Sequence, residues 1–273
     1  MIKKYRFLIA RRITQISIMV LYVIANLFGI NILMGNLSSS LVLNTIPLSD
    51  PYAVLQMFFA GAVISFDILL GAFFILIFYM ILGGRAFCSW VCPVNIITDF
   101  ANYLRKKFGF NQIQKKQPAS RNIRYWIIAI SFIISFLMGI TAFELISPIS
   151  MVHRGIIFGM GFGWAVISII FLFDLFVLKN GWCGHICPLG GFYSLIGRFS
   201  FLRVHHNAQN CTACMKCKEI CPENQVLHMI TKTSMPVLSG ECTNCGRCVE
   251  VCDDNALNFS IKNLKKEKQN EVR

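Results

Sequence analysis

The chain has 273 residues, of which 55% are hydrophobic and only 14% are charged, and its formal net charge is +13. A chain of this composition cannot keep its apolar surface away from water alone, which argues against an ordinary soluble protein and favours a membrane protein. A nucleic-acid-binding protein would need its basic residues gathered on a soluble domain, whereas here they flank apolar stretches.

Hydropathy predicts four membrane spans, each close to the ~20 residues that cross a hydrocarbon core. They cover residues 13–33, 63–82, 125–146 and 156–178. The apolar stretch 41–62 is interrupted by Pro47, Asp50 and Pro51, so it is predicted to be a loop or an interfacial segment. The predicted fold class is a membrane all-α domain over residues 1–204, with four transmembrane helices in two hairpins. A twin-arginine or signal-peptide interpretation of "RFLIARRIT" is less favoured, because the following apolar run is as long as a span and no cleavage site ends it.

The basic residues predict the orientation. Of 26 Lys and Arg, five precede residue 13, eight lie between Arg85 and Arg124, and twelve follow residue 178, whereas Arg154 alone lies in a connection on the other side. With four spans the three basic regions share one face, which the positive-inside rule makes cytoplasmic. We therefore expect a multi-pass protein of the bacterial inner membrane with both termini in the cytoplasm.

All twelve cysteines fall on that cytoplasmic face, where thiols stay reduced and metal or redox chemistry is expected. Eight form two runs, "CTACMKCKEICP" and "CTNCGRCVEVCD", with the spacing of bacterial ferredoxins. In that pattern the fourth cysteine of each run serves the other cluster. The sequence therefore predicts two [4Fe–4S] clusters in an α+β ferredoxin-like domain over residues 205–261, followed by a basic tail, 262–273. The predicted ligands are Cys211, Cys214, Cys217 and Cys252 for the first cluster, and Cys242, Cys245, Cys248 and Cys221 for the second.

An internal repeat at an offset of 31 residues supports this pairing, because all four cysteines of the two runs coincide. It also matches Glu219 with Glu250, Val226 with Leu257 and Ile230 with Ile261, which predicts two similar halves packed between the clusters. Structural zinc also takes four thiolates, but its ligands usually come as separated pairs.

The other four cysteines form two C-x3-C-P motifs, "CSWVCP" and "CGHICP", each after a predicted span that ends on the cytoplasmic side. Proline should break each helix at the second cysteine, Cys92 or Cys187. An amphipathic interfacial helix is expected over residues 94–108, and its N-terminus should lower the pKa of Cys92. Three interpretations stay open for Cys88, Cys92, Cys183 and Cys187: an additional metal centre, a redox-active thiol set, or docking contacts with inert thiols. His185 is a further candidate, although a solvent-facing histidine is the simpler expectation.

Ionisable residues near the outer ends of the spans are candidates for a quinol or proton site, since charges in a membrane are costly. They are Asp67, Glu144 and Arg154, with His153 beside them; Asp174 lies near the inner end of the fourth span. The simpler alternative is that these side chains reach water at the interface, with Glu144 and Arg154 forming an ion pair.

The segments "GNLSSSLVLNTIPLSDP", "FCSWVCPVNIITDFANYLR", "FLFDLFV" and "GWCGHICPLG" resemble the NapH family, the ferredoxin-type membrane subunits of periplasmic nitrate reductase systems. The resemblance implies an electron-transfer subunit of a quinol dehydrogenase. With an iron–sulfur partner, NapG, it would oxidise menaquinol or ubiquinol and pass electrons toward the periplasmic nitrate reductase, through or around a c-type cytochrome. Relatives such as MauN serve other periplasmic metalloenzymes, so the alternative is an accessory protein that supplies electrons for maturing or reactivating such an enzyme. A redox-sensing membrane protein is the weakest alternative, because no output domain is recognisable.

Overall fold

The computed structural model describes residues 5–29, 33–43, 45–109, 120–159, 161 and 163–261, so the predicted basic tail lies outside the described residues. The chain divides into two compact units. The larger consists of Arg11–Phe78 and Phe87–Phe192, and the smaller of Met1–Ala10, Tyr79–Ala86 and Tyr193–Arg273. The smaller unit thus contains the whole of the predicted ferredoxin-like range together with two segments from far earlier in the chain.

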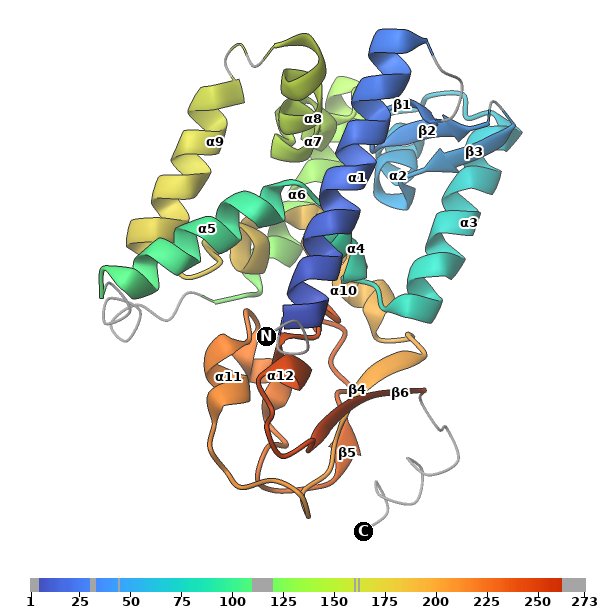
Figure 1. Ribbon diagram of the computed structural model, residues 1–273. Helices are drawn as coiled ribbons and strands as arrows, with labels where there is room; N and C mark the ends of the chain where they lie inside the picture. The colour runs from blue at the N-terminus through green and yellow to red at the C-terminus, as the bar shows by residue number, and fades with distance from the viewer. Residues whose placement is uncertain are drawn as a thin grey trace. The chain divides into compact units, whose positions relative to one another are not determined.

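Apolar helices occupy the predicted spans (Figure 1). They are α1 (Arg6–Phe28), α3 (Phe66–Leu82), α6 (Ile123–Met138) and α9 (Gly163–Leu172), the last continued by a π-helical turn, Phe173–Val177. Within the described part of the chain, α1 alone is long and apolar enough to cross a membrane by itself, and the other three are shorter apolar helices. The third predicted span ends early, because Gly139 adopts a left-handed conformation (φ 65°) that caps α6.

The all-α expectation for residues 1–204 is wrong between the first two spans. Residues beyond α1 form an antiparallel sheet in the order β1–β2–β3, with β1 at Leu33–Gly35, β2 at Ser39–Val42 and β3 at Ile46–Ser49. Gly35 has a φ of 103°, and a side chain there would overlap the carbonyl oxygen of Ser39, so the β1–β2 turn requires glycine. The predicted loop or interfacial segment is therefore a sheet followed by a helix.

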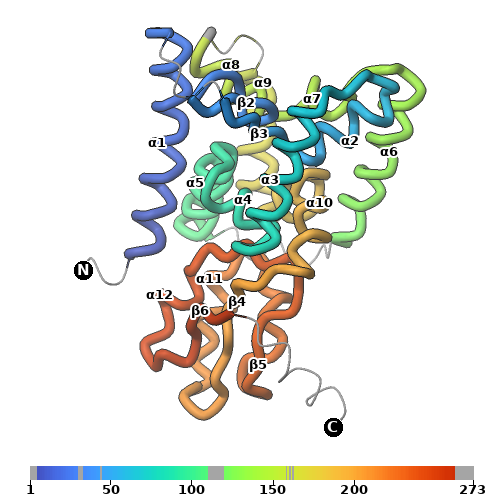
Figure 2. The backbone as a smooth tube through the Cα atoms, turned by 90° about the vertical axis from the view of Figure 1, so that its right-hand side faces the viewer, coloured from blue at the N-terminus to red at the C-terminus, as the bar shows by residue number. Residues whose placement is uncertain are grey.

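That helix, α2 (Pro51–Phe59), begins where Asp50 caps it and Pro51 occupies its first turn. It runs beside α6 (Figure 2). The Tyr52 hydroxyl lies 2.6 Å from the Ser131 hydroxyl, and the Tyr52 ring packs against Phe132 and Phe143. Two helices of the outer connection, α7 (Ala142–Ile146) and α8 (Pro148–Phe158), complete this part of the larger unit.

A short helical turn ends just before the second cysteine of each C-x3-C-P motif, but the expectation that each span itself breaks there is wrong, because the helices of the spans end earlier, at Leu82 and Val177. A short helix, α4 (Ala86–Trp90), ends before Cys92, and α5 (Val94–Lys107) follows with Pro93 at its N-cap. A π-helical turn, Trp182–Ile186, likewise ends before Cys187, and α10 (Pro188–Gly197) begins at the proline. The π-helical turns are local departures from α geometry that are frequent at functional sites.

The smaller unit contains a second antiparallel sheet in the order β5–β4–β6, with β4 at Leu202–His206, β5 at Met235–Pro236 and β6 at Leu257–Ile261. A short helix lies within each cysteine run and ends before its fourth cysteine, α11 (Lys216–Ile220) in the first run and α12 (Arg247–Glu250) in the second, and Asn224–Leu227 forms a 3₁₀ turn. Val226, Ile230 and Leu257 are buried in its core, as the repeat predicts. Ile261 is not, since it is 76% exposed at the end of β6.

Candidate functional site

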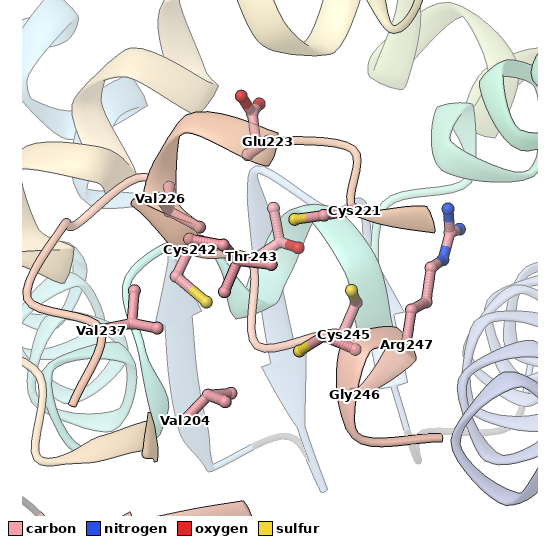
Figure 3. Close-up of a pocket in the computed structure, with 12 residues that line it drawn as sticks. Val204, Cys221, Glu223, Val226, Val237, Cys242, Thr243, Cys245, Gly246 and Arg247 are labelled. Atoms are coloured by element: carbon pink, nitrogen blue, oxygen red, sulfur yellow. The ribbon is translucent and has the colours of Figure 1, made fainter. Parts of the chain in front are cut away.

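The second predicted set of ligands lines a single cavity. Cys221, Cys242, Cys245 and Cys248 surround about 370 Å³ of space, part of it open to solvent. Figure 3 shows the sulfurs of Cys221, Cys242 and Cys245 turned toward this space from different loops. The cysteine from the first run therefore lies with the three of the second run, which is the arrangement of a two-cluster ferredoxin.

The first predicted set lines another cavity, of about 310 Å³, which holds Cys211, Cys214, Cys217 and Cys252. This cavity is the more accessible of the two, because Cys214 is exposed, whereas Cys221, Cys245 and Cys248 of the other set are buried. Asp254 and His206 also line its wall.

The backbone of each cysteine run is shaped to bind an anion. Ala213 and Met215 have φ values of 60° and 58°, and at the same positions of the repeat Asn244 and Gly246 have 47° and 74°. Alternation between left-handed and ordinary conformations turns successive N–H groups toward one concave side, a nest that binds anionic groups such as iron–sulfur clusters. Gly246 signals this geometry in the sequence, and Asn244 does so more weakly, since Asn adopts the left-handed conformation more readily than other residues with a side chain. Four thiols around a cavity with donors directed inward fit a [4Fe–4S] cluster.

Burial raises the pKa of three of these thiols: that of Cys242 to about 11, and those of Cys217 and Cys248 above their ordinary value, so these three are protonated when no metal is bound. A cluster must displace these protons, because thiolates are the ligands. In the described residues no three His, Cys, Asp or Glu side chains come close enough to share one metal ion.

The C-x3-C-P cysteines come from opposite halves of the larger unit. Cys92 and Cys187 are buried, and Cys88 and Cys183 are half-buried. Burial raises the pKa of Cys183 well above its ordinary value, and the charges of Cys92, Asp174, Cys187 and Cys88 raise it further, so the other three thiols lie within electrostatic reach of Cys183. The structure thus brings together two motifs that are 95 positions apart in the sequence.

The expected lowering of the Cys92 pKa is wrong in its net effect. The backbone N–H groups of Val94 and Asn95, at the start of α5, do lower the pKa of this thiol. Burial outweighs them and raises it far above its ordinary value, because the charged thiolate loses its hydration. A buried, protonated thiol is a poor nucleophile, which disfavours a freely exchanging thiol relay at this position.

Buried polar groups hold the C-x3-C-P segments in place. Gln15 of α1 donates hydrogen bonds to the carbonyls of Ser89 (3.1 Å) and Cys92 (3.2 Å). Arg124 of α6 donates to the carbonyl of Gly184 at 3.4 Å. His185, expected to face solvent, is instead 5% exposed. Hydropathy predicts none of these contacts. It counts Gln15, for example, only as one residue of a predicted membrane span.

Comparison with known proteins agrees with these cysteine sites. A "4Fe-4S dicluster domain" model matches residues 203–267, and a "4Fe-4S binding domain" model matches residues 57–111 and 160–205, the two C-x3-C-P segments. The chain is 42% identical to the methylamine utilization ferredoxin-type protein MauN of Methylorubrum extorquens, over 88% of this chain and 84% of the relative. It is 42% identical to the ferredoxin-type protein NapH of Haemophilus influenzae and 41% identical to NapH of Escherichia coli, over 81% and 82% of this chain and 77% and 78% of those proteins.

The chain belongs to the NapH and MauN family of ferredoxin-type proteins. The predicted resemblance to NapH is thereby confirmed, as are the [4Fe–4S]-binding domains and a role in electron transport. No solved structure matches the chain. The identities with MauN and NapH are equal within one percentage point, so identity alone does not separate the two branches of the family.

The three residues predicted to form a quinol or proton site do not lie in one cluster. Asp67, in the first turn of α3, and Arg154 are exposed. Glu144 accepts hydrogen bonds from the hydroxyls of Ser38 (2.7 Å) and Ser150 (2.6 Å). Within the described residues no hydrogen bond or ion pair joins Asp67, Glu144 and Arg154, so the expected ion pair of Glu144 with Arg154 is not formed.

His153 is the most enclosed of these outer groups. It is 2% exposed, and its ring packs edge-on against Tyr22 with centroids 4.7 Å apart. Neither ring nitrogen has a hydrogen-bond partner among the described residues. Burial lowers the pKa of His153, and the charge of Arg154 lowers it further, so the ring is neutral at pH 7.

Sequence reasoning missed a set of buried arginines, because it counted every Arg as a signal of topology. Arg11, Arg85, Arg105, Arg124 and Arg203 are at most 1% exposed. Arg105, expected at the basic end of an interfacial helix, donates instead to the carbonyls of Asp174 (3.1 Å) and Leu175 (3.2 Å) in the π-helical turn. Asp174 in turn accepts a 3.0 Å hydrogen bond from the N–H of Trp182, at the start of the second motif. No sequence signal distinguishes these arginines from exposed ones.

Proposed function

We propose that this chain is a membrane electron-transfer subunit that acts with an iron–sulfur partner similar to NapG. The complex oxidises menaquinol or ubiquinol and passes electrons toward a periplasmic nitrate reductase, through or around a c-type cytochrome. The observation that carries the proposal is the pair of cavities in one unit, each lined by four cysteines from two separate loops. Membership of the NapH and MauN family supports it.

The proposed ligands are Cys211, Cys214, Cys217 and Cys252 for one cluster and Cys221, Cys242, Cys245 and Cys248 for the other. A bound [4Fe–4S] cluster supplies one-electron transfer, since it accepts and returns a single electron. The chain contributes thiolates, inward-facing N–H groups and a core that keeps water from most of the second cluster. These contributions hold the two redox groups in fixed positions within one small unit.

The proposed topology is four spans with both termini in the cytoplasm. Its support is the coincidence of four apolar helices with the predicted spans and the distribution of the basic residues. Large apolar side chains such as Phe73, Phe136 and Ile169 are at least half exposed on α3, α6 and α9, as lipid-facing residues are. A tilted or locally thinned bilayer accommodates the shorter helices.

The C-x3-C-P cysteines Cys88, Cys92, Cys183 and Cys187 are proposed to hold a further metal centre that serves as an intermediate step of electron transfer. The support is their mutual electrostatic influence and the iron–sulfur family model that matches both segments. Anaerobic purification with iron quantitation of the wild type and of a Cys88→Ala/Cys183→Ala variant tests this site. Equal iron in both proteins would rule it out.

The proton-accepting site for quinol oxidation is proposed at the outer side, with Glu144, Asp67 and Arg154 as candidates beside His153. Glu144 has the best support, because two hydroxyls orient its carboxylate. Asp67 and Arg154 are exposed and would act at the surface.

The decisive experiment uses anaerobic membranes that contain this chain and its partner. A menaquinol analogue is added, and reduction of the clusters is followed by electron paramagnetic resonance together with reduction of the acceptor. Quinol-dependent reduction of both supports the proposal. Clusters that remain oxidised in the presence of quinol would contradict it.

A second function is favoured by one observation, the 42% identity with MauN, whose name assigns it to methylamine utilization. In this alternative the chain supplies electrons for maturing or reactivating a periplasmic metalloenzyme. The experiment with anaerobic membranes described above also distinguishes the respiratory function from the accessory function. Continuous quinol-dependent reduction of the acceptor indicates a respiratory subunit, whereas a limited electron transfer that activates a newly made enzyme indicates the accessory role.

A further inference from the structure

One buried ion pair stands beside the cavity of the second cluster. Arg85, 1% exposed, donates a 2.7 Å hydrogen bond to the carboxylate of Glu223, whose side chain is 3% exposed. The same guanidinium nitrogen donates to the carbonyl of Glu241 at 3.1 Å. Glu223 lines the cavity and lies two residues after Cys221, and Glu241 directly precedes Cys242. Arg85 therefore joins the two loops that bring Cys221 and Cys242 to one cavity.

The backbone around Arg85 is built to place it there. Gly83 has a φ of 118°, and a side chain at that position would overlap Asn244. Asn244 itself donates to the carbonyls of Leu82 (2.7 Å) and Leu202 (3.0 Å). This segment, Tyr79–Ala86, belongs to the same compact unit as the cysteine runs, although it lies more than a hundred residues earlier in the chain.

A buried ion pair costs desolvation energy, and a well-packed apolar pair is often as stable, so its presence calls for a role besides stability. We propose that Arg85 and Glu223 form a positioning pair that sets the reduction potential of the cluster held by Cys221, Cys242, Cys245 and Cys248. The inference rests on the proposed cluster site. One-electron reduction of a [4Fe–4S]²⁺ cluster, by a reduced quinone or an iron–sulfur donor, adds one negative charge. A nearby cation favours that added charge and a nearby carboxylate opposes it, and both effects are strong where water is excluded.

The other half of the repeat lacks this pair. At the offset of 31 residues Glu223 corresponds to Asp254, which lines the first cavity. Asp254 accepts hydrogen bonds from the backbone and hydroxyl of Thr212, at an exposed position. Its neighbour Asp253 pairs with Lys216, and both side chains are more than half exposed. Solvent screens these charges, and among the ion pairs of the described residues the Arg85–Glu223 pair, at the second cavity, is the one whose two side chains are both at most 3% exposed.

The test is a redox titration of the full-length, anaerobically purified protein, monitored by electron paramagnetic resonance. Glu223→Gln removes the negative charge with little change of shape, and the potential of the second cluster should rise. Arg85→Met removes the positive charge, and the same potential should fall. In the double variant the potential should return toward the wild-type value. Asp254→Asn should raise only the other potential, and by less than Glu223→Gln raises its own because solvent screens Asp254, which assigns each potential to its cluster.

Opposite shifts for Glu223→Gln and Arg85→Met are the signature of an electrostatic role, since a purely structural role would perturb the cluster in the same way in both variants. If the Arg85→Met protein does not incorporate the cluster, the potentials of the Arg85→Lys and Glu223→Gln proteins decide whether the pair acts electrostatically. Arg85→Lys should keep the potential near the wild-type value. Shifts of the same sign, or unchanged potentials with both cluster signals intact, would overturn the inference. A wild-type protein without two cluster signals would instead overturn the proposed function.

Discussion

The carboxylate of Glu250 accepts a 3.0 Å hydrogen bond from the backbone N–H of Leu8. It also accepts one from the backbone N–H of Phe7, so a residue of α12, within the second cysteine run, satisfies two donors that have no intrahelical partner at the start of α1. An anionic side chain at this end also interacts favourably with the helix dipole. The first turn of α1 is thereby fixed to the ferredoxin-like unit, to which residues 1–10 belong.

Replacing Glu250 by Ala should destabilise the smaller unit by about 1–2 kcal/mol, the usual cost of losing a helix cap. Loss of cluster absorbance on heating or in urea measures the effect. The control is Glu219→Ala, since Glu219 occupies the same position in the other half of the repeat and is exposed. Equal losses in the two variants would show that the contact with α1 has no specific effect.

The crossed ligand assignment predicts which cysteine variants resemble one another. Cys221→Ser and Cys245→Ser should remove the same spectroscopic signal, because both thiols line one cavity. Cys252→Ser should remove the other signal, since Cys252 lines the cavity with the first run. Electron paramagnetic resonance of the reduced proteins distinguishes the cases. If Cys221→Ser behaved like Cys214→Ser, each run would bind its own cluster and the crossed assignment would be wrong.

Replacement of Gly84 by Ala should prevent stable folding or cost more than about 2 kcal/mol, the scale of a severe overpacking change. A methyl group there would overlap the carbonyl oxygen of Tyr193 and the backbone nitrogen of Gly197. Gly163→Ala is the matched control, because its nearest neighbours would be 3.7 Å away. Yield and thermal unfolding in detergent provide the comparison, and similar stability of the two variants would contradict the tight packing around Gly84.

His153 should make the larger unit less stable in acid. Burial lowers the pKa of this histidine below its ordinary value of 6.5, so the unfolded chain takes up a proton before the folded chain does. The contribution is complete above pH 6.5 and is lost as the pH falls through the folded-state pKa. The thermal midpoint should therefore drop between pH 7.5 and 5.5, and less so in His153→Gln. An identical drop in both proteins would assign the pH dependence to other groups.

Arg105 should contribute more to the stability of the folded protein than its neighbour Lys107 at the end of α5. Arg105→Met leaves the carbonyls of Asp174 and Leu175 without their donor inside the protein, at a cost of about 1–3 kcal/mol. Lys107→Met, at an exposed position, should cost less than about 0.5 kcal/mol. Thermal unfolding of the purified proteins tests the difference, and equal midpoints would show that the π-helical turn does not depend on Arg105.

Spacing and proline chemistry predicted the parts of the fold that are governed by local rules. The two cysteine runs predicted which thiols share a cavity, and Pro93 predicted where α5 begins. Both follow from short-range geometry, so a single sequence is enough to reveal them.

Other features depend on contacts between distant segments. Hydropathy could not distinguish buried Arg105 from exposed Lys107, because burial of an arginine depends on carbonyls about 70 residues away. The sheet at residues 33–49 was missed for a related reason, since its strands are three or four residues long and lie in an apolar stretch that also suits a membrane interface. The left-handed residues Ala213 and Met215 gave no signal, because neither residue type favours that conformation.

The smaller unit draws on residues 1–10, 79–86 and 193–273, and this composition determines when it can be completed during biosynthesis. Residues 1–10 leave the ribosome long before Glu250, which holds the start of α1. Because Arg85 must also wait for Glu223, the two cysteine-lined cavities cannot close until the segment that carries Cys252 has been translated. We therefore expect iron and sulfide to be inserted only after Cys252 has been made.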